Sequence, residues 1–309
     1  MSRIGRALRI LSANPRLFLR VLAGKIREKG PAPRGTVKRT VNGVVFNLDF
    51  DFDPGPATRF MYFGTYEPLV VEAMRLLLKP GDTFIDVGAN IGYLSAVGAG
   101  FVKTSGQVHS FEPVPNLFER LLSFAQANPS YNITPHKCAL GDGEGTAKIN
   151  VFPPFNIGWC TMVPGFGADQ KQPESITVPV TRLDRHIEEH KLRGITLIKI
   201  DVEGFEFPVL KGLKHYFDKT DELPAIICEI APDAYPLLDL TPAQLSEYLA
   251  HYGYRAFSII DRRTEIDITK LEGTSNAIFL PAAREPCGGA GTQPRRRRCT
   301  GSGKTPQPG

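Results

Sequence analysis

The stretch Thr83-Phe-Ile-Asp-Val-Gly-Ala-Asn-Ile-Gly92 decides the fold of this chain. Its first five residues are mostly β-branched or aromatic, which is typical of a buried parallel strand. The strand is expected to end at Gly88, and a helix is expected over 91–102. Glycines let a backbone approach a ligand closely, and the start of a helix offers unbonded N–H groups at the same place. The stretch therefore predicts a strand, a ligand-binding turn and a helix.

Strands and helices alternate through the rest of the chain. Further strands are expected over 107–111, 133–140, 195–200, 225–230, 255–260 and 276–280, and helices over 69–78, 116–128, 205–217 and 242–252. This alternation indicates an α/β fold, with a mostly parallel seven-stranded sheet and helices on both faces. Only a turn-rich segment joins the last two strands, so we expect them to pair antiparallel, with an antiparallel strand at the edge of the sheet.

Three segments do not follow the alternation. Residues 40–52 predict a hairpin that turns at Asn42-Gly43. The aromatic segment 60–68 is interpreted either as a lid over the ligand or as a core contact. Residues 143–180 are rich in glycine, proline and aromatic residues, and we expect hairpins or a cap there.

The ends of the chain differ from its body in charge. The 309 residues carry a net charge of +5, but residues 1–40 hold 11 Lys/Arg against one acidic residue, and 282–309 hold 6 against one. The body is therefore acidic, and we predict no nucleic-acid partner from a positive charge confined to the ends. The expected organisation is a basic N-terminal helix and linker over 1–39, one domain over 40–281, and a disordered basic tail over 282–309.

Residues 1–29 alternate basic and apolar side chains in the manner of an amphipathic helix broken at Asn14-Pro15. Such a helix either lies on an anionic membrane surface or docks on the protein, and the sequence leaves both open. No apolar run is long enough to span a bilayer. The five cysteines form no C-x-x-C pair, and no histidine stands at zinc-ligand spacing, which favours a reducing, cytoplasmic setting with the membrane surface as the alternative.

The residues around the central turn predict a nucleoside ligand. Glu112 follows the second strand by one residue, where a carboxylate can accept hydrogen bonds from both ribose hydroxyls. The nicotinamide fingerprint G-x-G-x-x-G fails at Asn90 and Leu94. Asp86 places a carboxylate at the mouth of the first strand, which suits a cationic group better than a pyrophosphate. A ligand with an ammonium group, a ribose and no phosphate is S-adenosyl-L-methionine.

Several motifs together resemble the FkbM family of class I methyltransferases. They are Asp86-Val-Gly-Ala-Asn-Ile-Gly-Tyr93, Phe111-Glu-Pro113, Leu183-Asp184, Ile198-Lys-Ile-Asp-Val-Glu-Gly-Phe-Glu206 and Leu210-Lys-Gly212. The similarity covers roughly residues 60–281. It implies a Rossmann-like fold and an S-adenosyl-L-methionine-dependent O-methyltransferase, often one that acts on a sugar hydroxyl of a glycan, glycolipid or glycosylated natural product.

Position in this fold suggests roles for the cofactor-binding residues. Three turn residues should shape the methionine and ribose pocket: Gly88, Asn90 and Gly92. Asp86 should lie near the cofactor's amino group, and Glu112 should hold the ribose. Asp142 follows the third strand, where it either accepts from the adenine amino group or only forms the turn Gly-Asp-Gly.

An acidic cluster follows the fourth strand. Asp201 and Glu203 are expected in the active site, whereas Glu206 is expected to cap the next helix. Asp201 could take the proton from the acceptor hydroxyl. Alternatively, Asp201 with Glu203 or Glu229 could hold Mg²⁺, which would lower the pKa of that hydroxyl.

The acceptor is not fixed by these patterns. A small molecule or a glycan is the expected partner. A lipid or protein acceptor remains an alternative, and so does a non-catalytic adenosyl-binding module at a membrane surface.

Overall fold

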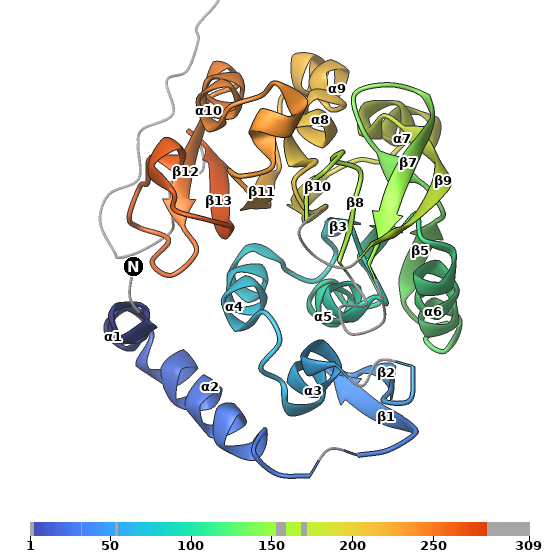
Figure 1. Cartoon of the computed structure of the whole chain (residues 1–309), viewed down its shortest axis with the longest axis vertical. Helices are drawn as coiled ribbons and strands as arrows, with labels where there is room; N and C mark the ends of the chain where they lie inside the picture. Colours follow the sequence, from blue (N-terminus) through green and yellow to red (C-terminus); the bar gives the residue numbers. More distant parts are fainter. Residues whose placement is uncertain (1–2, 32, 53–54, 153–158, 168–171, 283–309) are drawn as a thin grey trace, which may run out of the picture.

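Seven short strands form the central sheet of the computed structural model, which describes residues 3–31, 33–52, 55–152, 159–167 and 172–282 (Figure 1). The sheet order is β12-β13-β11-β10-β3-β4-β5. The strands are β3 (Thr83–Val87), β4 (Gln107–Phe111), β5 (Asn132–His136), β10 (Ile195–Ile200), β11 (Ala225–Ile230), β12 (Tyr254–Ser258) and β13 (Ser275–Pro281). The five strands from β11 to β5 are parallel to their neighbours, and β13 is antiparallel to both β11 and β12. The predicted α/β class is therefore confirmed, with one difference: the antiparallel strand lies one place in from the edge.

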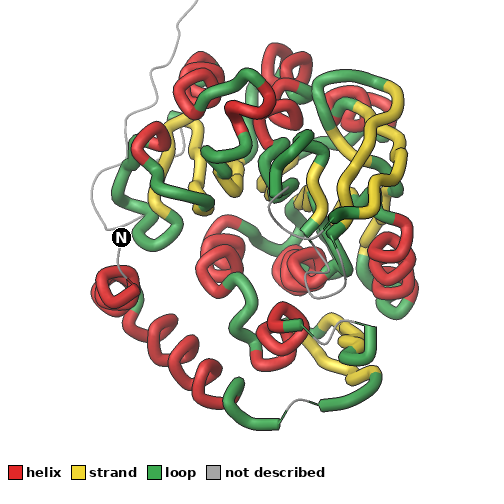
Figure 2. The backbone as a smooth tube through the Cα atoms, viewed as in Figure 1, coloured by secondary structure: helices red, strands yellow, loops and turns green. Residues whose placement is uncertain are grey.

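Helices cover both faces of this sheet, as Figure 2 shows with helices and strands in different colours. One face carries α4 (Pro68–Leu77), α5 (Tyr93–Val102) and α6 (Pro115–Gln126), and the other carries α7 (Leu183–Glu189), α8 (Glu206–Lys211), α9 (Lys214–Lys219) and α10 (Pro242–His251). Side chains alternate along each strand, so Phe84 packs into the first core and its neighbour Ile85 into the second. Consecutive residues of one strand thus reach different layers of the protein.

A second, four-stranded sheet fills the predicted cap. It is built from β6 (Ala139–Leu140), β7 (Gly145–Val151), β8 (Cys160–Thr161) and β9 (Glu174–Thr181), in the order β6-β9-β7-β8. The single strand predicted over 133–140 is wrong, because β5 ends at His136 and the chain then enters β6 of the second sheet. The hairpin pattern predicted for 143–180 is confirmed in the pairing of β7 with β8 and with β9.

The N-terminal segment begins with α1 (Arg3–Ala13) and α2 (Pro15–Arg27), which separate at the predicted break. The hairpin of β1 (Thr36–Val41) and β2 (Val44–Asp49) turns at Asn42 and Gly43, both with positive φ, as predicted. Its first strand begins at Thr36, four residues before the predicted start. Part of the aromatic segment forms α3 (Pro56–Phe63). None of the helices in the described ranges combines the length and apolar character needed to cross a bilayer.

Two other helix predictions need correction. The helix expected over 205–217 divides into α8 and α9 at Gly212, where an added Cβ would lie 2.1 Å from the carbonyl oxygen of Gly141. The helix α7 was not predicted, and its seven residues are too few for periodicity to show. Two 3₁₀ turns, η2 (Tyr235–Leu238) and η3 (Ile268–Lys270), complete the described elements. The predicted disordered tail lies, from residue 283 on, outside the described residues.

Gly88, directly after β3, contacts the C-terminal end of β4 and the turn after β10. It has a φ of +78° and donates a hydrogen bond of 3.0 Å to the carbonyl oxygen of Phe111. A Cβ at this position would lie only 1.9 Å from the carbonyl oxygen of Asp201. The turn after β3 can therefore meet the turn after β10 only if residue 88 is glycine.

We expect Gly88→Ala to destabilise the protein by about 3 kcal/mol or more, because the methyl group combines an unfavourable φ with a clash against rigid backbone. The free energy of unfolding in urea measures this. Gly143→Ala is the matched control: nothing lies within 4 Å of its Cβ, and its cost should stay within about 0.5 kcal/mol. Equal stability of the two variants would contradict the close approach of the two turns.

Candidate active site

Two adjoining hollows lie at the C-terminal ends of β3, β4 and β10. The empty space is about 540 Å³ at the first and about 430 Å³ at the second, and both figures include space that is open to solvent. Apolar side chains from the small sheet and α6, including Leu117, Ala139 and Met162, line much of the first. Four residues line both hollows: Gly88, Asn90, Asp201 and Glu203. The hollows are therefore two parts of one site at the edge where parallel sheets bind ligands.

The turn between β3 and α5 carries the residues predicted to shape this site. Asn90 has a φ of +54°, and its backbone N–H donates a 2.8 Å hydrogen bond to Oε2 of Glu112. Gly92 is the N-cap of α5, and a Cβ there would lie 2.9 Å from the side chains of Leu121 and Phe124. Gly92 is absent from the lining of both hollows. Its place is thus a packing contact with α6, whereas Gly88 and Asn90 face the site.

Glu112 is buried at the wall of the first hollow. Oε2 accepts from Asn90 and Oε1 accepts a 2.9 Å hydrogen bond from the backbone N–H of Val114. Burial raises the pKa of Glu112 to about 7, although both hydrogen bonds act to lower it. A carboxylate offers about four lone-pair directions, so two acceptor positions remain for a ligand.

A row of polar side chains crosses the sheet on the α5 side. Asp86 is the register partner of Ser110 on β4 and of Lys199 on β10. Oδ2 of Asp86 accepts a 2.6 Å hydrogen bond from Ser95, whose hydroxyl in turn accepts one of 2.8 Å from Ser110. Oδ1 of Asp86 has no hydrogen-bond partner among the described residues, although Nζ of Lys199 lies 4.0 Å away. The expected carboxylate of Asp86 is therefore in the site, lining the second hollow.

Lys199 is the residue to which sequence reasoning gave no role. Its side chain is 4% exposed, and Nζ lies 3.1 Å from Oδ2 of Asp201. Burial lowers the pKa of Lys199, but the charges of Asp201 and Asp86 outweigh burial and the net result is a raised pKa. The ammonium group therefore stays charged. A lysine inside the otherwise apolar strand Ile195–Ile200 was the available signal.

Three carboxyl groups meet beside this lysine. Asp201, Glu203 and Glu229 each offer an oxygen, and these oxygens lie within 4.8 Å of one another. Burial, followed by the charge of Asp201, raises the pKa of Glu203 to about 8 and that of Glu229 to about 11. Such oxygens are the ligands that Mg²⁺ prefers, so the donor set fits the predicted metal alternative.

The backbone of Glu203 is held in the left-handed region, with a φ of +53°. Its carbonyl oxygen accepts a 2.6 Å hydrogen bond from Thr161 of β8, and its side chain accepts one from Trp159. The small sheet thus supports the turn that carries Glu203. A strained residue fixed by its surroundings is typical of functional sites.

Two other acidic residues serve the structure in ways the sequence only partly indicated. Oε1 of Glu206 accepts hydrogen bonds from Gly204 (2.8 Å) and Val202 (3.3 Å), so Glu206 braces the turn before α8 from inside the core. Asp142 forms an ion pair of 2.6 Å with Lys211 and its side chain is 47% exposed. Asp142 is not among the residues that line either hollow.

The aromatic segment also reaches the site. Met61 and Tyr66 line the second hollow opposite Asp86 and Lys199. The ring of Tyr66 meets the ring of Tyr93 edge-on, with centroids 5.4 Å apart. The segment is therefore both a wall of the hollow and a contact with α5.

Comparisons with known proteins identify the family of this chain. The family model for the methyltransferase FkbM domain matches residues 86–256. Hexuronic acid methyltransferase AglP of Haloferax volcanii is 28% identical over 146 residues, which cover 46% of this chain and 55% of that protein. The 31-O-demethyl-FK506 methyltransferase FkbM of Streptomyces tacrolimicus is 29% identical over 166 residues, covering 44% of this chain and 61% of that one.

This chain thus spans little more than half the length of these curated relatives. Among solved structures, methyltransferase FkbM from Methylobacillus flagellatus aligns with 86% of this chain and 60% of its own length, at 17% identity and a TM-score of 0.41. The segment matched by the family model runs from Asp86 of β3 to Ala256 of β12, which is more than half of the sequence. The chain belongs to the FkbM methyltransferase family.

Proposed function

We propose that this chain is an S-adenosyl-L-methionine-dependent O-methyltransferase that methylates a hydroxyl group of a sugar or of a sugar-bearing small molecule. The observation that carries the proposal is the paired hollow at the C-terminal ends of β3 and β10. The first part is mostly apolar and contains the Glu112 carboxylate, Asp86 and Lys199 line the second, and Asp201 and Glu203 line both. A nucleoside fits the first and a cationic group fits the second.

The residues of the site match the groups of this cofactor. Glu112 has two acceptor positions for the ribose hydroxyls, and Gly88 and Asn90 lie between the hollows. Oδ1 of Asp86 is buried and lacks a hydrogen-bond partner among the described residues, so it can accept from the ammonium group. When bound, S-adenosyl-L-methionine supplies an electrophilic methyl group on a sulfonium. Asp142 would need to leave Lys211 to reach the adenine.

The electrostatics also favour a cation. Burial raises the pKa of Glu203 and Glu229, and the negative charge of Asp201 raises both further. A positive group that enters the second hollow would relieve this repulsion, whereas a phosphate would increase it.

Proton removal from the acceptor hydroxyl falls to Glu203 and Asp201. Sequence reasoning considered Asp201 first, but Asp201 is bound to Lys199 at 3.1 Å. Glu203 has a pKa of about 8, close to a working pH, which is the property that an efficient general base needs. We therefore assign proton transfer to Glu203 and the positioning of the hydroxyl to Asp201.

The acceptor class rests on the relatives. One carries hexuronic acid in its name, and the other carries an O-demethyl natural product. Residues 153–158, in the segment expected to form hairpins or a cap, lie outside the described residues. Lipid headgroups and peptides are therefore included beside sugars when the acceptor is sought.

We expect the full chain to bind S-adenosyl-L-methionine and its demethylated product, and Glu112→Ala to weaken both by roughly 1.5–3 kcal/mol, because the charged acceptor for the ribose is lost. Titration calorimetry measures both affinities, and NAD serves as the competing ligand class.

Asp142→Ala is the matched control for Glu112→Ala, because it also removes a carboxylate but at a residue that lines neither hollow. Unchanged affinity in this variant assigns Asp142 to the turn, and a loss equal to that of Glu112→Ala restores its adenine role. Binding of NAD in preference to S-adenosyl-L-methionine would overturn the cofactor assignment.

We expect kcat/KM to rise with pH and to level off above about pH 8, because Glu203 must lose its proton to act as a base. Glu203→Gln should lower turnover by roughly 10²- to 10⁴-fold and abolish this pH dependence. In Asp201→Asn the dependence should persist but move to lower pH, since the charge of Asp201 raises the pKa of Glu203. Release of S-adenosylhomocysteine with a panel of hexuronic acids, other sugars, lipid headgroups and peptides measures these rates.

Loss of the pH dependence in Asp201→Asn, with its retention in Glu203→Gln, would transfer the base role to Asp201. Activity that EDTA removes and Mg²⁺ restores would assign the carboxyl groups to a metal site. Tight cofactor binding with no turnover on any acceptor would indicate a non-catalytic module.

We also propose that the N-terminal helices contact an anionic membrane surface. One face of α2 docks on the protein through Leu17 and through Gly24, whose Cβ position is filled by Thr65. The opposite face exposes three large apolar side chains: Leu19 (61% exposed), Leu22 (45%) and Ile26 (62%). Exposed basic residues flank this stripe: Arg16, Arg20, Lys25 and Arg27. An apolar stripe between basic side chains is typical of helices that lie in a membrane interface.

The triple change Leu19→Ser, Leu22→Ser and Ile26→Ser should abolish co-sedimentation with phosphatidylserine vesicles and leave cofactor affinity unchanged, because these side chains face away from the docked side. It is a cleaner test than deletion of residues 1–30, which would also remove the Leu17 contact. Leu237→Ser, at another exposed leucine (48% exposed) on η2, is the control. Equal sedimentation of all three proteins would reject membrane contact.

A further inference from the structure

A cluster of histidines lies on the face of the sheet opposite the polar row. His109 stands on β4 between Val108 and Ser110, which both face α5, so its side chain points toward α7. His136 ends β5, and His186 is on α7. The three come from separate segments, which explains why zinc-ligand spacing in the sequence did not reveal them.

The nitrogen atoms of the cluster have nearly the spacing of a metal site. Nδ1 of His109 lies 3.2 Å from Nε2 of His136, a hydrogen bond in which the proton on one nitrogen would give way to the metal. Two imidazole nitrogens bound to one tetrahedral metal at 2.0–2.1 Å are about 3.3 Å apart. One ring nitrogen from each of His109, His136 and His186 lies within 4.8 Å of those of the other two. The three imidazoles are thus close enough to converge on one ion after small side-chain movements.

The contacts outside the cluster leave ring nitrogens of His109 and His186 available to bind a metal ion. Nε2 of His109 lies 3.4 Å from Oε1 of Gln107, and as a donor to that oxygen it leaves the lone pair of Nδ1 facing His136. Metal-bound histidines usually have such an outer acceptor. His186 is 6% exposed, and its Nε2 is buried without a hydrogen-bond partner among the described residues. A buried nitrogen without a partner is costly in an apolar core, and a metal ion would satisfy it.

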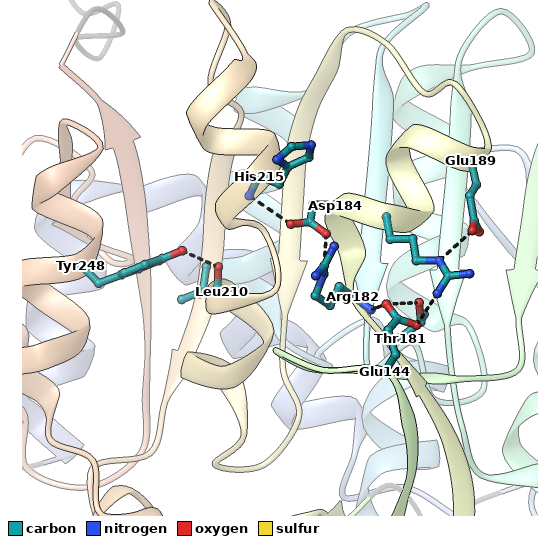
Figure 3. A network of polar contacts seen from close by, with 9 residues as sticks. Glu144, Thr181, Arg182, Asp184, Glu189, Leu210, His215 and Tyr248 are labelled. Atoms are coloured by element: carbon teal, nitrogen blue, oxygen red, sulfur yellow. Dashed lines mark hydrogen bonds and ion pairs between the residues drawn. The ribbon is translucent and has the colours of Figure 1, made fainter.

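A network of polar contacts joins the start of α7 to α9 and to Glu144 before β7 (Figure 3). The carboxylate of Asp184 accepts a 3.0 Å hydrogen bond from Nε of Arg182 and another of 3.0 Å from the backbone N–H of His215. Glu144 accepts from the backbone N–H of Arg182 at 3.0 Å. Since this network anchors the first turn of α7, His186 is held in place one turn or less further along.

We propose that His109, His136 and His186 bind a divalent transition metal of the zinc class as a structural site. His190, at the exposed end of α7, packs against His186 with ring centroids 4.1 Å apart and lies outside this group of three. All-imidazole sites suit Zn²⁺, whereas Mg²⁺ prefers oxygen ligands. The ion would join β4, β5 and α7.

The site would also stiffen one wall of the first hollow. The ring of Phe111 lines that hollow and stacks on His136, with centroids 4.6 Å apart. The carbonyl oxygen of His136 accepts a 3.1 Å hydrogen bond from the backbone N–H of Glu112. This proposal does not depend on the proposed methyl transfer, because it concerns different residues on the other face of the sheet.

The test uses the full chain without a polyhistidine tag, stripped of metal with a chelator and titrated with Zn²⁺ and with Co²⁺. We expect one Zn²⁺ per chain, the strong visible absorption of tetrahedral Co²⁺, and a melting temperature about 5 °C higher at 100-fold excess over the dissociation constant. His186→Asn and His136→Asn should each weaken Zn²⁺ binding at least tenfold and remove the Co²⁺ absorption. His251→Asn, at an exposed histidine ending α10, is the control and should bind as the parent does.

Circular dichroism spectra show whether each variant is folded, and the two ligand variants differ in burial, so the test does not depend on either one alone. Glu229→Gln should keep the Zn²⁺ site, which separates it from the carboxyl cluster. Absence of Zn²⁺ binding in the parent, or equal binding in folded His186→Asn and the parent, would overturn the proposal.

Discussion

The buried ammonium group of Lys199 is the interaction on which the arrangement of the site depends. A lysine in the interior of a sheet is costly unless carboxylates pair with it. Here the carboxylates come from two segments: Asp86 lies beside Lys199 in the register of β3 and β10, and Asp201 directly follows the end of β10. A shift of one residue between these strands would turn Asp86 to the other face and leave the lysine unpaired. The ion pair therefore selects the register that also brings Gly88 against Asp201.

The same lysine sets the charge balance of the second hollow. It offsets the charge of Asp201, while Glu203 and Glu229 remain close to one another and to Asp201 without a cation of their own among the described residues. Burial and then the charge of Asp201 raise the pKa values of both groups. A hollow with more carboxyl groups than cations is organised to receive positive charge, from a cationic ligand or from a metal ion. Lys199 thus fixes the register of β3 and β10, and a bound cation would offset the remaining negative charge.

The succession of strand, glycine turn and helix around residues 83–102 could be predicted from the sequence, because that information is local. β3, its glycine turn and α5 form one continuous pattern of β-branched residues, glycines and apolar residues. The division of α8 from α9 depended instead on the contact between Gly212 and Gly141, which are distant in the chain. The positions of Glu112 and Asp201 at strand ends followed from the parallel sheet alone. Three features could not be predicted: the ion pair of Asp142 with Lys211, the pairing of Lys199 and the clustering of the histidines. They depend on the register of strands and the docking of helices, which a single sequence does not contain.

Strand β4 shows how one short segment serves both faces of the sheet. Ser110 belongs to the hydrogen-bonded row behind Asp86, while His109 and Phe111 face α7. Glu112 then leaves the strand and is held by the turn after β3 through Asn90. Because alternation assigns these neighbours to different layers, substitutions in the α7 layer can reach the wall of the first hollow through Phe111 and the backbone of His136 without touching a carboxylate. This wall is therefore supported from the opposite face of the sheet, where the histidines lie.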